Sequence, residues 1–482
     1  MNLLPRFLMH PRISLGWMLP LAFALGLSLA PDARGADRKG AAKLRPDTIP
    51  PEVFRLIEAK EDQLKDLALR LKLEVSDDVW DFFDTLREGS WKEIEAAFRE
   101  LRRRAGQYDN YTRDPGVAGV IWSPTLECEM AYEHFALGER KYFEAFGRDI
   151  LDSIPRGSLY FGGTDPGRSL PTAFSRDHAK GDPFFTLTQN ALADGTYLQY
   201  LRAMYGGKIH VPTDAESSAA FQAYVADAQS RYDHDHAHPD EPAQLRPGED
   251  YQTANGKIMV SGQVAVMSIN GLLVKTIIDQ TPAPEVFIEE SFPIDWMYPH
   301  LEPHGLILKL HRSPLAGLGA EVVQKDFDYW QPRLTGMVGG WLKPGVSTRE
   351  VCDFATKVHI DRDLTGFAGD PKFVRNDYSM RAFSKLRSAI AGVYEWRARN
   401  SKSALEKERM GRAAGDAFRQ AFALSPSNAD LTTRWVRYLT SNGNVDEARL
   451  VAMTASKVSP GNATLSRLNA ELQKGGTPSR KE

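Results

Sequence analysis

Polar and charged residues that could bind a ligand follow three short apolar runs of the sequence. They lie in the segments 162–168, 188–194 and 289–296, and they are Thr164, Asp165, Arg168, Gln189, Asn190, Asp194, Glu290 and Asp295. Carboxylates and amides form hydrogen bonds with ligand hydroxyl groups, and an arginine can hold a phosphate or a carboxylate in a fork. Gly162 and Gly163 allow a ligand to approach the backbone closely. We therefore predict a ligand-binding site formed by these three segments.

The same residues also have a purely structural interpretation. Asp165-Pro166-Gly167 is typical of a helix start, with Asp165 as the N-cap and the proline in the first turn. Asp295 could likewise cap a helix that begins at Trp296. The sequence leaves open whether these acids bind a ligand, catalyse a reaction or only cap helices.

Motifs that bind particular cofactors or metals are absent from the sequence. It contains no His-Glu-x-x-His, no Gly-x-Ser-x-Gly, no P-loop and no Cys-x-x-Cys. His234, His236 and His238 would share one side of an extended segment and could hold a metal ion. The polar run around them, 232–239, fits a flexible loop equally well. We expect no cofactor and no metal.

The elements that would position the candidate residues are predicted to be strands alternating with helices. Apolar runs predict strands at 157–161, 184–187, 285–288 and 306–310, and a further short strand at 209–211. Helices are predicted near 167–179, 191–204, 215–232 and 262–278. This alternation is typical of a parallel sheet, which binds ligands at the carboxyl ends of its strands. We predict a Rossmann-like α/β domain at 155–312, with an open, mostly parallel sheet flanked by helices.

Helical segments are predicted on both sides of this domain. Residues 37–154 form an N-terminal helical segment, and residues 313–376 form a helical connector. In the N-terminal segment, Ser76 and Ser90 are predicted N-caps, and Glu93 completes a capping box with Ser90. Residues 107–125 are predicted to be a loop, followed by a helical stretch at 127–154.

Residues 377–474 predict an all-α region of tetratricopeptide-like repeats. The spacing of Ala414, Phe418, Ala421 and Pro426 is that of the second helix of such a repeat. Pro460 lies 34 residues after Pro426, which is the period of the repeat, and small residues recur at Ala448 and Ala455. The alternative is a generic helical hairpin. We expect a protein partner to bind this region, and we expect residues 475–482 to form a disordered tail.

The first 36 residues are typical of an export signal. Arg6, His10 and Arg12 precede an uncharged run at 13–30, and the small residues Ala33 and Gly35 would allow cleavage before Ala36. The alternative is an uncleaved membrane anchor, because the run just reaches the length that spans a bilayer. We predict a periplasmic or secreted protein, anchored to the inner membrane if the segment is retained.

Composition narrows the class of protein further. The chain has 482 residues, of which 42% are hydrophobic and 26% charged, as in folded globular proteins. A net charge of −3 argues against a nucleic-acid partner, which requires a basic surface. Two cysteines, Cys128 and Cys352, are too few for a disulfide scaffold; they could pair with each other or remain two separate buried thiols.

The order of these segments resembles a known family. Residues 157–168, 184–194, 287–291 and 296–306, followed by helical repeats, are similar to the soluble C-terminal region of bacterial DUF2723 membrane proteins. That family is similar to protein O-mannosyltransferases. Its members carry a many-helix membrane part that holds the transferase chemistry, and this chain has no matching positions. The resemblance therefore implies the fold and a cell-envelope setting rather than transferase activity.

Three functions are consistent with these patterns. The leading hypothesis is an exported cell-envelope module that binds a glycan, a lipid-linked sugar or a protein partner. The second is an enzyme that acts on a sugar or phosphate ester at the carboxyl edge of the strands. The third is a tetratricopeptide scaffold for protein assembly.

Overall fold

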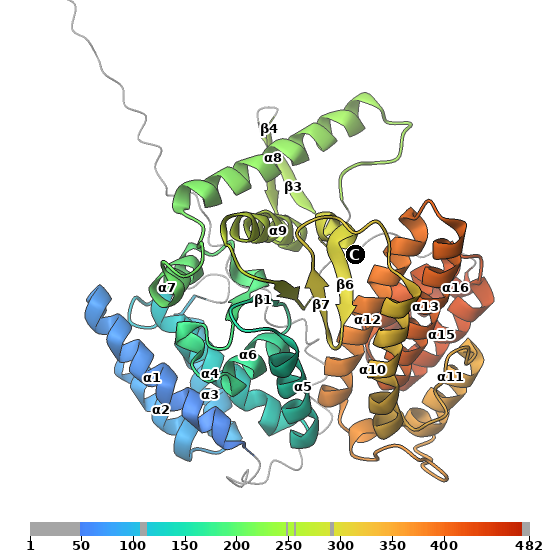
Figure 1. Cartoon of the computed structure of the whole chain (residues 1–482), viewed down its shortest axis with the longest axis horizontal. Helices are drawn as coiled ribbons and strands as arrows, with labels where there is room; N and C mark the ends of the chain where they lie inside the picture. Colours follow the sequence, from blue (N-terminus) through green and yellow to red (C-terminus); the bar gives the residue numbers. More distant parts are fainter. Residues whose placement is uncertain (1–48, 107–112, 247–248, 255–256, 290–293, 475–482) are drawn as a thin grey trace, which may run out of the picture.

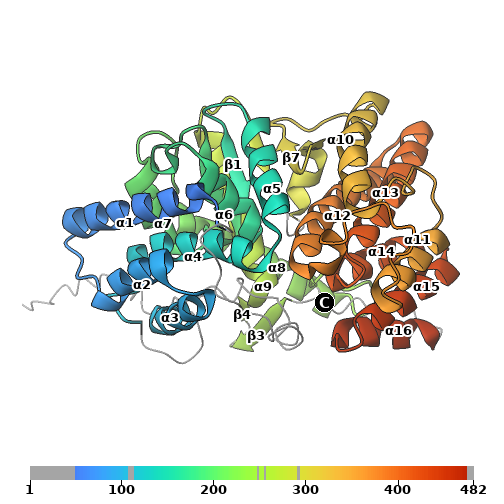
Figure 2. The same cartoon turned by 90° about the horizontal axis from the view of Figure 1, so that it is seen from below.

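The computed structural model describes residues 49–106, 113–246, 249–254, 257–289 and 294–474. The described chain is mostly helical, with a five-stranded sheet and a separate two-stranded sheet. Figure 1 shows N-terminal helices, the five-stranded sheet and C-terminal helices side by side, and Figure 2 shows the same order from below. The predicted export signal at 1–36 and the predicted tail at 475–482 lie outside the described residues.

The N-terminal part contains α1 (Pro51–Leu71), α2 (Asp77–Glu88), α3 (Trp91–Arg104), the 3₁₀ turn η4 (Gly119–Ile121), α4 (Trp122–Leu137) and α5 (Arg140–Ser153). Ser76 and Ser90 occupy the N-cap positions of α2 and α3, and Glu93 completes the capping box, which confirms these predictions. The predicted loop 107–125 is too long, because α4 begins at Trp122.

The single helical stretch predicted at 127–154 is in fact two helices, α4 and α5, separated near Gly138. A Cβ atom at Gly138 would lie 1.9 Å from the ring of Phe143. The chain can therefore turn tightly between the two helices only because this residue has no side chain.

The central sheet has the strand order β2-β1-β5-β7-β6. The strands are β1 (Leu159–Gly162), β2 (Phe185–Thr188), β5 (Val286–Ile288), β6 (Leu301–His304) and β7 (Ile307–Leu310). Strand β1 runs parallel to β2 and β5, with Tyr160 opposite both Thr186 and Phe287. Strand β7 is antiparallel to both β5 and β6.

The sheet is thus mixed, and the prediction of a mostly parallel sheet is wrong. The strand missing from the prediction is β6, which forms a hairpin with β7. This hairpin turns at Gly305, whose φ of 65° is one that glycine adopts without strain. Because the hairpin reverses the chain, β7 enters the sheet antiparallel to β5.

Helices connect the parallel strands. Helix α6 (Asp165–Phe174) follows β1, and α7 (Gly195–Tyr205), α8 (Asp214–Ala237) and α9 (Gly262–Gln280) lie between β2 and β5 in the sequence. A hairpin of β3 (Asp250–Ala254) and β4 (Lys257–Ser261) lies beside α8 at the margin of the molecule (Figure 1). The short strand predicted at 209–211 is replaced by a single bridge between Gly206 and Ile209.

The histidine run is helical, so its prediction as a flexible loop or an extended segment is wrong. Helix α8 continues through His234 and His236 to Ala237. Arg231, one turn before, forms an ion pair with the buried Glu249, and the ring of Tyr232 lies against His236. These contacts favour continuation of the helix over a loop.

The C-terminal part contains α10 (Ala320–Val338), α11 (Thr348–Ala355), the π-helical turn η8 (Thr356–Ile360), α12 (Asp377–Asn400), α13 (Ala404–Leu424), α14 (Ala429–Ser441), α15 (Val445–Val458) and α16 (Ala463–Gln473). Short turns join α12 to α13 and α14 to α15, which makes each pair a helical hairpin. Ala414, Phe418 and Ala421 are all fully buried on α13. Arg387 of α12 and Asp326 of α10 form a buried ion pair with an N–O distance of 2.7 Å.

Polar contacts join the N-terminal helices to the C-terminal part. The ring nitrogens of His134 on α4 lie 2.9 Å from the Ser169 hydroxyl of α6 and 2.8 Å from the Tyr378 hydroxyl of α12. Burial lowers the pKa of His134 to about 4, so the ring is neutral and offers one donor and one acceptor. On α5, the Tyr142 hydroxyl donates to Asp370 at 2.7 Å.

Candidate functional site

A carboxylate of the chain itself occupies the N-terminus of α6. Glu289 directly follows β5, is 1% exposed, and accepts hydrogen bonds from the backbone N–H of Gly163 at 3.0 Å and of Thr164 at 2.8 Å. The Thr164 hydroxyl also donates to it. Burial raises the pKa of Glu289, and these hydrogen bonds oppose that rise. The close approach to the backbone that we predicted for a ligand at Gly162 and Gly163 is therefore made by Glu289.

Gly167 makes room for this carboxylate. A Cβ atom at Gly167 would lie 1.5 Å from Oε2 of Glu289. The N-cap of α6 is Thr164, whose side chain accepts from the Gly167 N–H at 3.0 Å. Asp165 is the first residue inside the helix, so the prediction that Asp165 is the N-cap is wrong by one position.

The Arg168 guanidinium is paired within the chain. Its Nη2 donates to Oδ1 of Asp165 at 2.7 Å, and the residue is 8% exposed. Its Nε is buried without a hydrogen-bond partner in the described part of the chain. The charge of Arg168 is thus already balanced by Asp165, and its Nε is enclosed by protein atoms.

A pocket lies beside the carboxyl end of β2, between α4, α6 and α7. Of the predicted site residues, Arg168 and Asp194 line it. Thr188, the last residue of β2, lines it as well. The other lining residues are Gly119, Trp122, Ser123, Leu126, Glu127, Met130, Ala191, Thr196 and Tyr197. The hollow with its open mouth encloses about 370 Å³.

Glu127 forms one wall of this pocket and is held by a buried lysine. Lys60 of α1, which is 2% exposed, forms an ion pair with Oε2 of Glu127. The Tyr200 hydroxyl lies 3.1 Å from the same oxygen, and Lys60 also donates to Tyr200 at 2.8 Å. Among the described residues, none bonds to the second oxygen, Oε1. One oxygen of Glu127 is thus fixed, and the other is available to a ligand.

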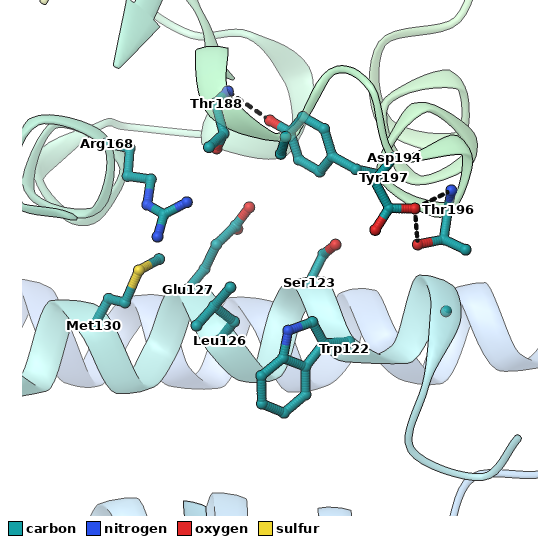
Figure 3. Close-up of a pocket in the computed structure, with 12 residues that line it drawn as sticks. Trp122, Ser123, Leu126, Glu127, Met130, Arg168, Thr188, Asp194, Thr196 and Tyr197 are labelled. Carbon is teal, nitrogen blue, oxygen red and sulfur yellow. Dashed lines mark hydrogen bonds between the residues drawn. The ribbon is translucent and has the colours of Figure 1, made fainter. Parts of the chain in front are cut away.

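Asp194 and Tyr197 form the opposite wall. Asp194 is the N-cap of α7, and its Oδ1 accepts from the Thr196 N–H and hydroxyl, both at 2.8 Å. Within the described ranges, Oδ2 of Asp194 has no partner. Figure 3 shows Ser123 and Glu127 extending from α4 toward this wall, and the Arg168 guanidinium turned toward Glu127. The Tyr197 hydroxyl accepts from the Thr188 N–H at 2.7 Å and so fixes the end of β2.

The two predicted amides shape the loop behind the pocket. Asn190, in the 3₁₀ turn η6 (Gln189–Ala191), donates to the Gly163 carbonyl at 2.8 Å and so ties the loop after β2 to the loop after β1. Gln189 is fully buried, and both atoms of its amide group lack partners among the described residues. Neither amide lines the pocket.

Two further predicted residues are not part of this site. Asp295 is exposed at the start of the 3₁₀ helix η7 (Asp295–His300) and does not line the pocket. Ile294 is the N-cap of η7, so the predicted capping role of Asp295 is also wrong. Glu290 lies outside the described residues.

A second group of acids lies further along α4. Glu129 is 7% exposed, and burial together with the nearby carboxylates of Glu133 and Asp165 raises its pKa well above the ordinary value. No hydrogen bond to Glu129 is formed in the described part of the chain. Its surroundings therefore favour the protonated form of Glu129.

Sequence reasoning missed the contribution of α4. Ser123, Glu127 and Glu129 were placed in a loop and an ordinary helix, with no chemical role. A usable signal was present, because α4 is buried on most sides and still carries acids at 127, 129 and 133. Acidic residues in a helix that is otherwise buried require partners or a function.

Other chemistry-bearing groups are accounted for in simpler ways. Cys128 and Cys352 are both free and buried. In the described ranges, no three His, Cys, Asp or Glu side chains are grouped so that they could hold a metal ion. No helix among the described residues combines the length and the apolar character needed to cross a membrane.

Comparisons with protein-family models, curated proteins and solved structures found no match to this chain.

Proposed function

We propose that this chain is an exported cell-envelope module that binds the sugar of a glycan or a lipid-linked sugar in the pocket between α4 and α7. The observation that carries the proposal is the pair of fixed carboxylates, Glu127 and Asp194, each with one free oxygen at the pocket. Sugar hydroxyls are donors that pair well with such oxygens.

The remaining lining suits the rest of a sugar. Ser123 and Thr188 add hydroxyl groups that can form hydrogen bonds with ring or hydroxyl oxygens of the sugar. Leu126 and Met130 offer apolar surface to the C–H groups of the ring. A phosphate is disfavoured at the start of α6, because Glu289 already occupies the position that an anion would take there. In a lipid-linked sugar, the sugar rather than the phosphate would be recognised.

Two features of the sequence support the proposed cell-envelope setting. The N-terminal 36 residues favour export, and the resemblance to the soluble region of DUF2723 proteins favours the cell envelope and a Rossmann-like description of the α/β part. Helices α12 to α16 fit tetratricopeptide-like repeats, with Ala414, Phe418 and Ala421 facing neighbouring helices, and they would bind a protein partner.

Ligand-detected NMR with a panel of neutral and charged monosaccharides tests sugar binding. Ser123→Ala and Thr188→Val each remove one hydroxyl from the pocket at nearly constant shape, and each should weaken binding about two- to tenfold. Asp446→Asn, on the exposed side of α15, is the matched surface control. Absence of saturable binding by every sugar, or unchanged affinity in both pocket variants, would refute the proposal.

Glu129 favours a second candidate function, an enzyme acting on a sugar. Glycoside cleavage by general acid–base catalysis needs two carboxyl groups, one of them with a raised pKa, and burial raises the pKa of Glu129, which has the carboxyl groups of Glu133 and Asp165 nearby. Release of nitrophenol from nitrophenyl glycosides measures this activity. Glu129→Gln should abolish it, and Glu100→Gln, at an exposed site on α3, should leave it unchanged. Equal rates in the two variants would exclude Glu129 as the acid.

A further inference from the structure

We propose that the free edge of β3 pairs with β3 of a second copy of this chain, which joins the two hairpins into one four-stranded antiparallel sheet. The hairpin of β3 and β4 forms a sheet of its own, and neither strand pairs with another strand of the described chain. Figure 2 shows this hairpin at the margin of the molecule. The proposal does not depend on sugar binding at the pocket.

Helix α8 covers the outer edge of β4 but leaves that of β3 free. The Ile258 N–H of β4 donates to the Gln229 side chain of α8 at 2.7 Å, so it points away from β3. In an antiparallel pair, opposite residues point their backbone groups either both toward each other or both away, and the two cases alternate along the strands. Thr253, opposite Ile258, therefore points its N–H and C=O away from β4, and Tyr251 does the same.

These four backbone groups are open to another strand. Outside the hairpin, no described residue forms a hydrogen bond with the N–H or C=O of Tyr251 or Thr253. Residues 251–253 are exposed and include neither a proline nor a charged residue, and the register with β4 is continuous, without a bulge. Proteins commonly protect an unpaired edge strand with one of these features. The edge of β3 has none of them.

A second copy fits this edge because β3 is complementary to itself. When two β3 strands run antiparallel with their Gln252 residues opposite each other, Tyr251 of each copy lies opposite Thr253 of the other. The outward N–H and C=O groups of these residues then form four hydrogen bonds, and an aromatic residue opposite a β-branched one is a favourable pair. The two Asp250 residues lie at opposite ends of the paired strands, so like charges do not face each other.

This pairing fixes two distances that can be tested. The two Gln252 residues would form a non-hydrogen-bonded pair with Cα atoms about 4.5 Å apart, which is within the range of a disulfide. Met259 lies opposite Gln252 on β4, so the two copies of Met259 would be three strand spacings, about 14 Å, apart. That distance is too long for a disulfide. Gln252 and Met259 are both exposed, whereas the native Cys128 and Cys352 are buried.

Oxidation of Gln252→Cys and of its matched control Met259→Cys, each in the full chain, tests the geometry. A non-reducing gel measures the disulfide-linked dimer, which should form at least about tenfold faster in Gln252→Cys. Analytical ultracentrifugation of the wild type between about 1 and 200 µM should show a monomer–dimer equilibrium, because a contact this small is expected to be weak.

Thr253→Pro separates pairing from folding. It removes the outward N–H from each copy, and an edge strand tolerates proline where its N–H faces solvent, so the monomer should melt like the wild type. Loss of two hydrogen bonds per dimer should weaken dimerisation by about tenfold or more. Thr253→Val keeps the N–H and the branched side chain and should keep the dimer.

Three results would overturn the proposal. They are a wild-type chain that stays monomeric over the whole concentration range, equal cross-linking of the two cysteine variants, and unchanged dimerisation of a folded Thr253→Pro variant. If Thr253→Pro melts at a lower temperature than the wild type, the comparison of Gln252→Cys with Met259→Cys decides the question, because neither change alters the backbone.

Discussion

Gly167→Ala is the sharpest test of the arrangement at the start of α6. In the structure, Oε2 of Glu289 lies 1.5 Å from the position that the new Cβ atom would take, and the carboxyl carbon lies 2.2 Å from it. Ordinary contacts of this kind are 3.4 Å or longer. The carboxylate must therefore leave its place beside Gly163 and Thr164, or α6 must shift.

The cost follows from the hydrogen bonds that this movement breaks. The backbone N–H groups of Gly163 and Thr164 donate to Glu289 at 3.0 and 2.8 Å, and both would be left buried without an acceptor. Each unsatisfied group costs about 1–3 kcal/mol, and the helix propensity of alanine returns at most about 1 kcal/mol. We expect a net loss of about 1–5 kcal/mol, which for a chain of this length corresponds to a fall of roughly 1–5 °C in melting temperature.

Thermal unfolding followed by circular dichroism measures the change, and Gly411→Ala is the matched control. Gly411 lies inside α13, and no atom approaches the position of its missing Cβ within 4 Å. The same substitution there should raise stability by about 0.5–1 kcal/mol. A melting temperature of Gly167→Ala equal to or above that of the wild type would show that Glu289 does not occupy the start of α6.

Three further predictions concern neighbouring features. Burial raises the pKa of Glu289 above the ordinary 4.5, so the folded state binds this proton up to a higher pH than the unfolded state does. The stability of the folded protein should therefore fall as the pH rises above 4.5, and it should fall less steeply in Glu289→Gln. Melting temperatures measured between about pH 4 and 8 test this prediction. Arg168→Ala should lower the free energy of unfolding by about 1 kcal/mol. The cost is modest because the Asp165 side chain, which loses its partner, is 34% exposed to water. An unchanged melting temperature would mean that the ion pair is not formed. Ala421→Leu and Ala448→Leu should each cost about 1–3 kcal/mol in urea unfolding, because both positions are fully buried; unchanged midpoints would place these alanines away from any partner helix.

Local sequence patterns predicted individual elements better than their directions. The apolar run at 306–310 correctly indicates β7 (Ile307–Leu310), but nothing within that run shows whether the strand is parallel or antiparallel to its neighbours. Direction depends on the preceding strand β6, whose sequence Leu-Glu-Pro-His includes a proline that argues against a strand. Gly305 between the two strands was the available signal for a hairpin.

The candidate site was predicted in part, for a similar reason. Arg168 and Asp194 could be found because they directly follow strands, where an α/β sheet presents its loops. Glu127 could not be placed near them, because its position depends on the docking of α4 and on the buried Lys60 of α1. Glu289 was overlooked in favour of its neighbour Glu290, since alternation along the chain does not show which acid turns inward.

The contacts of α4 and α5 with the C-terminal part also determine when the chain can finish folding during synthesis. His134 and Tyr378 are 244 residues apart in sequence, and Tyr142 and Asp370 are 228 apart. Closing such long loops is slow, and it must wait until the start of α12 has left the ribosome. Until then α4 and α5 expose surfaces that a chaperone can bind, so chains truncated before Asp370 should aggregate or be degraded rather than accumulate as a stable N-terminal fragment.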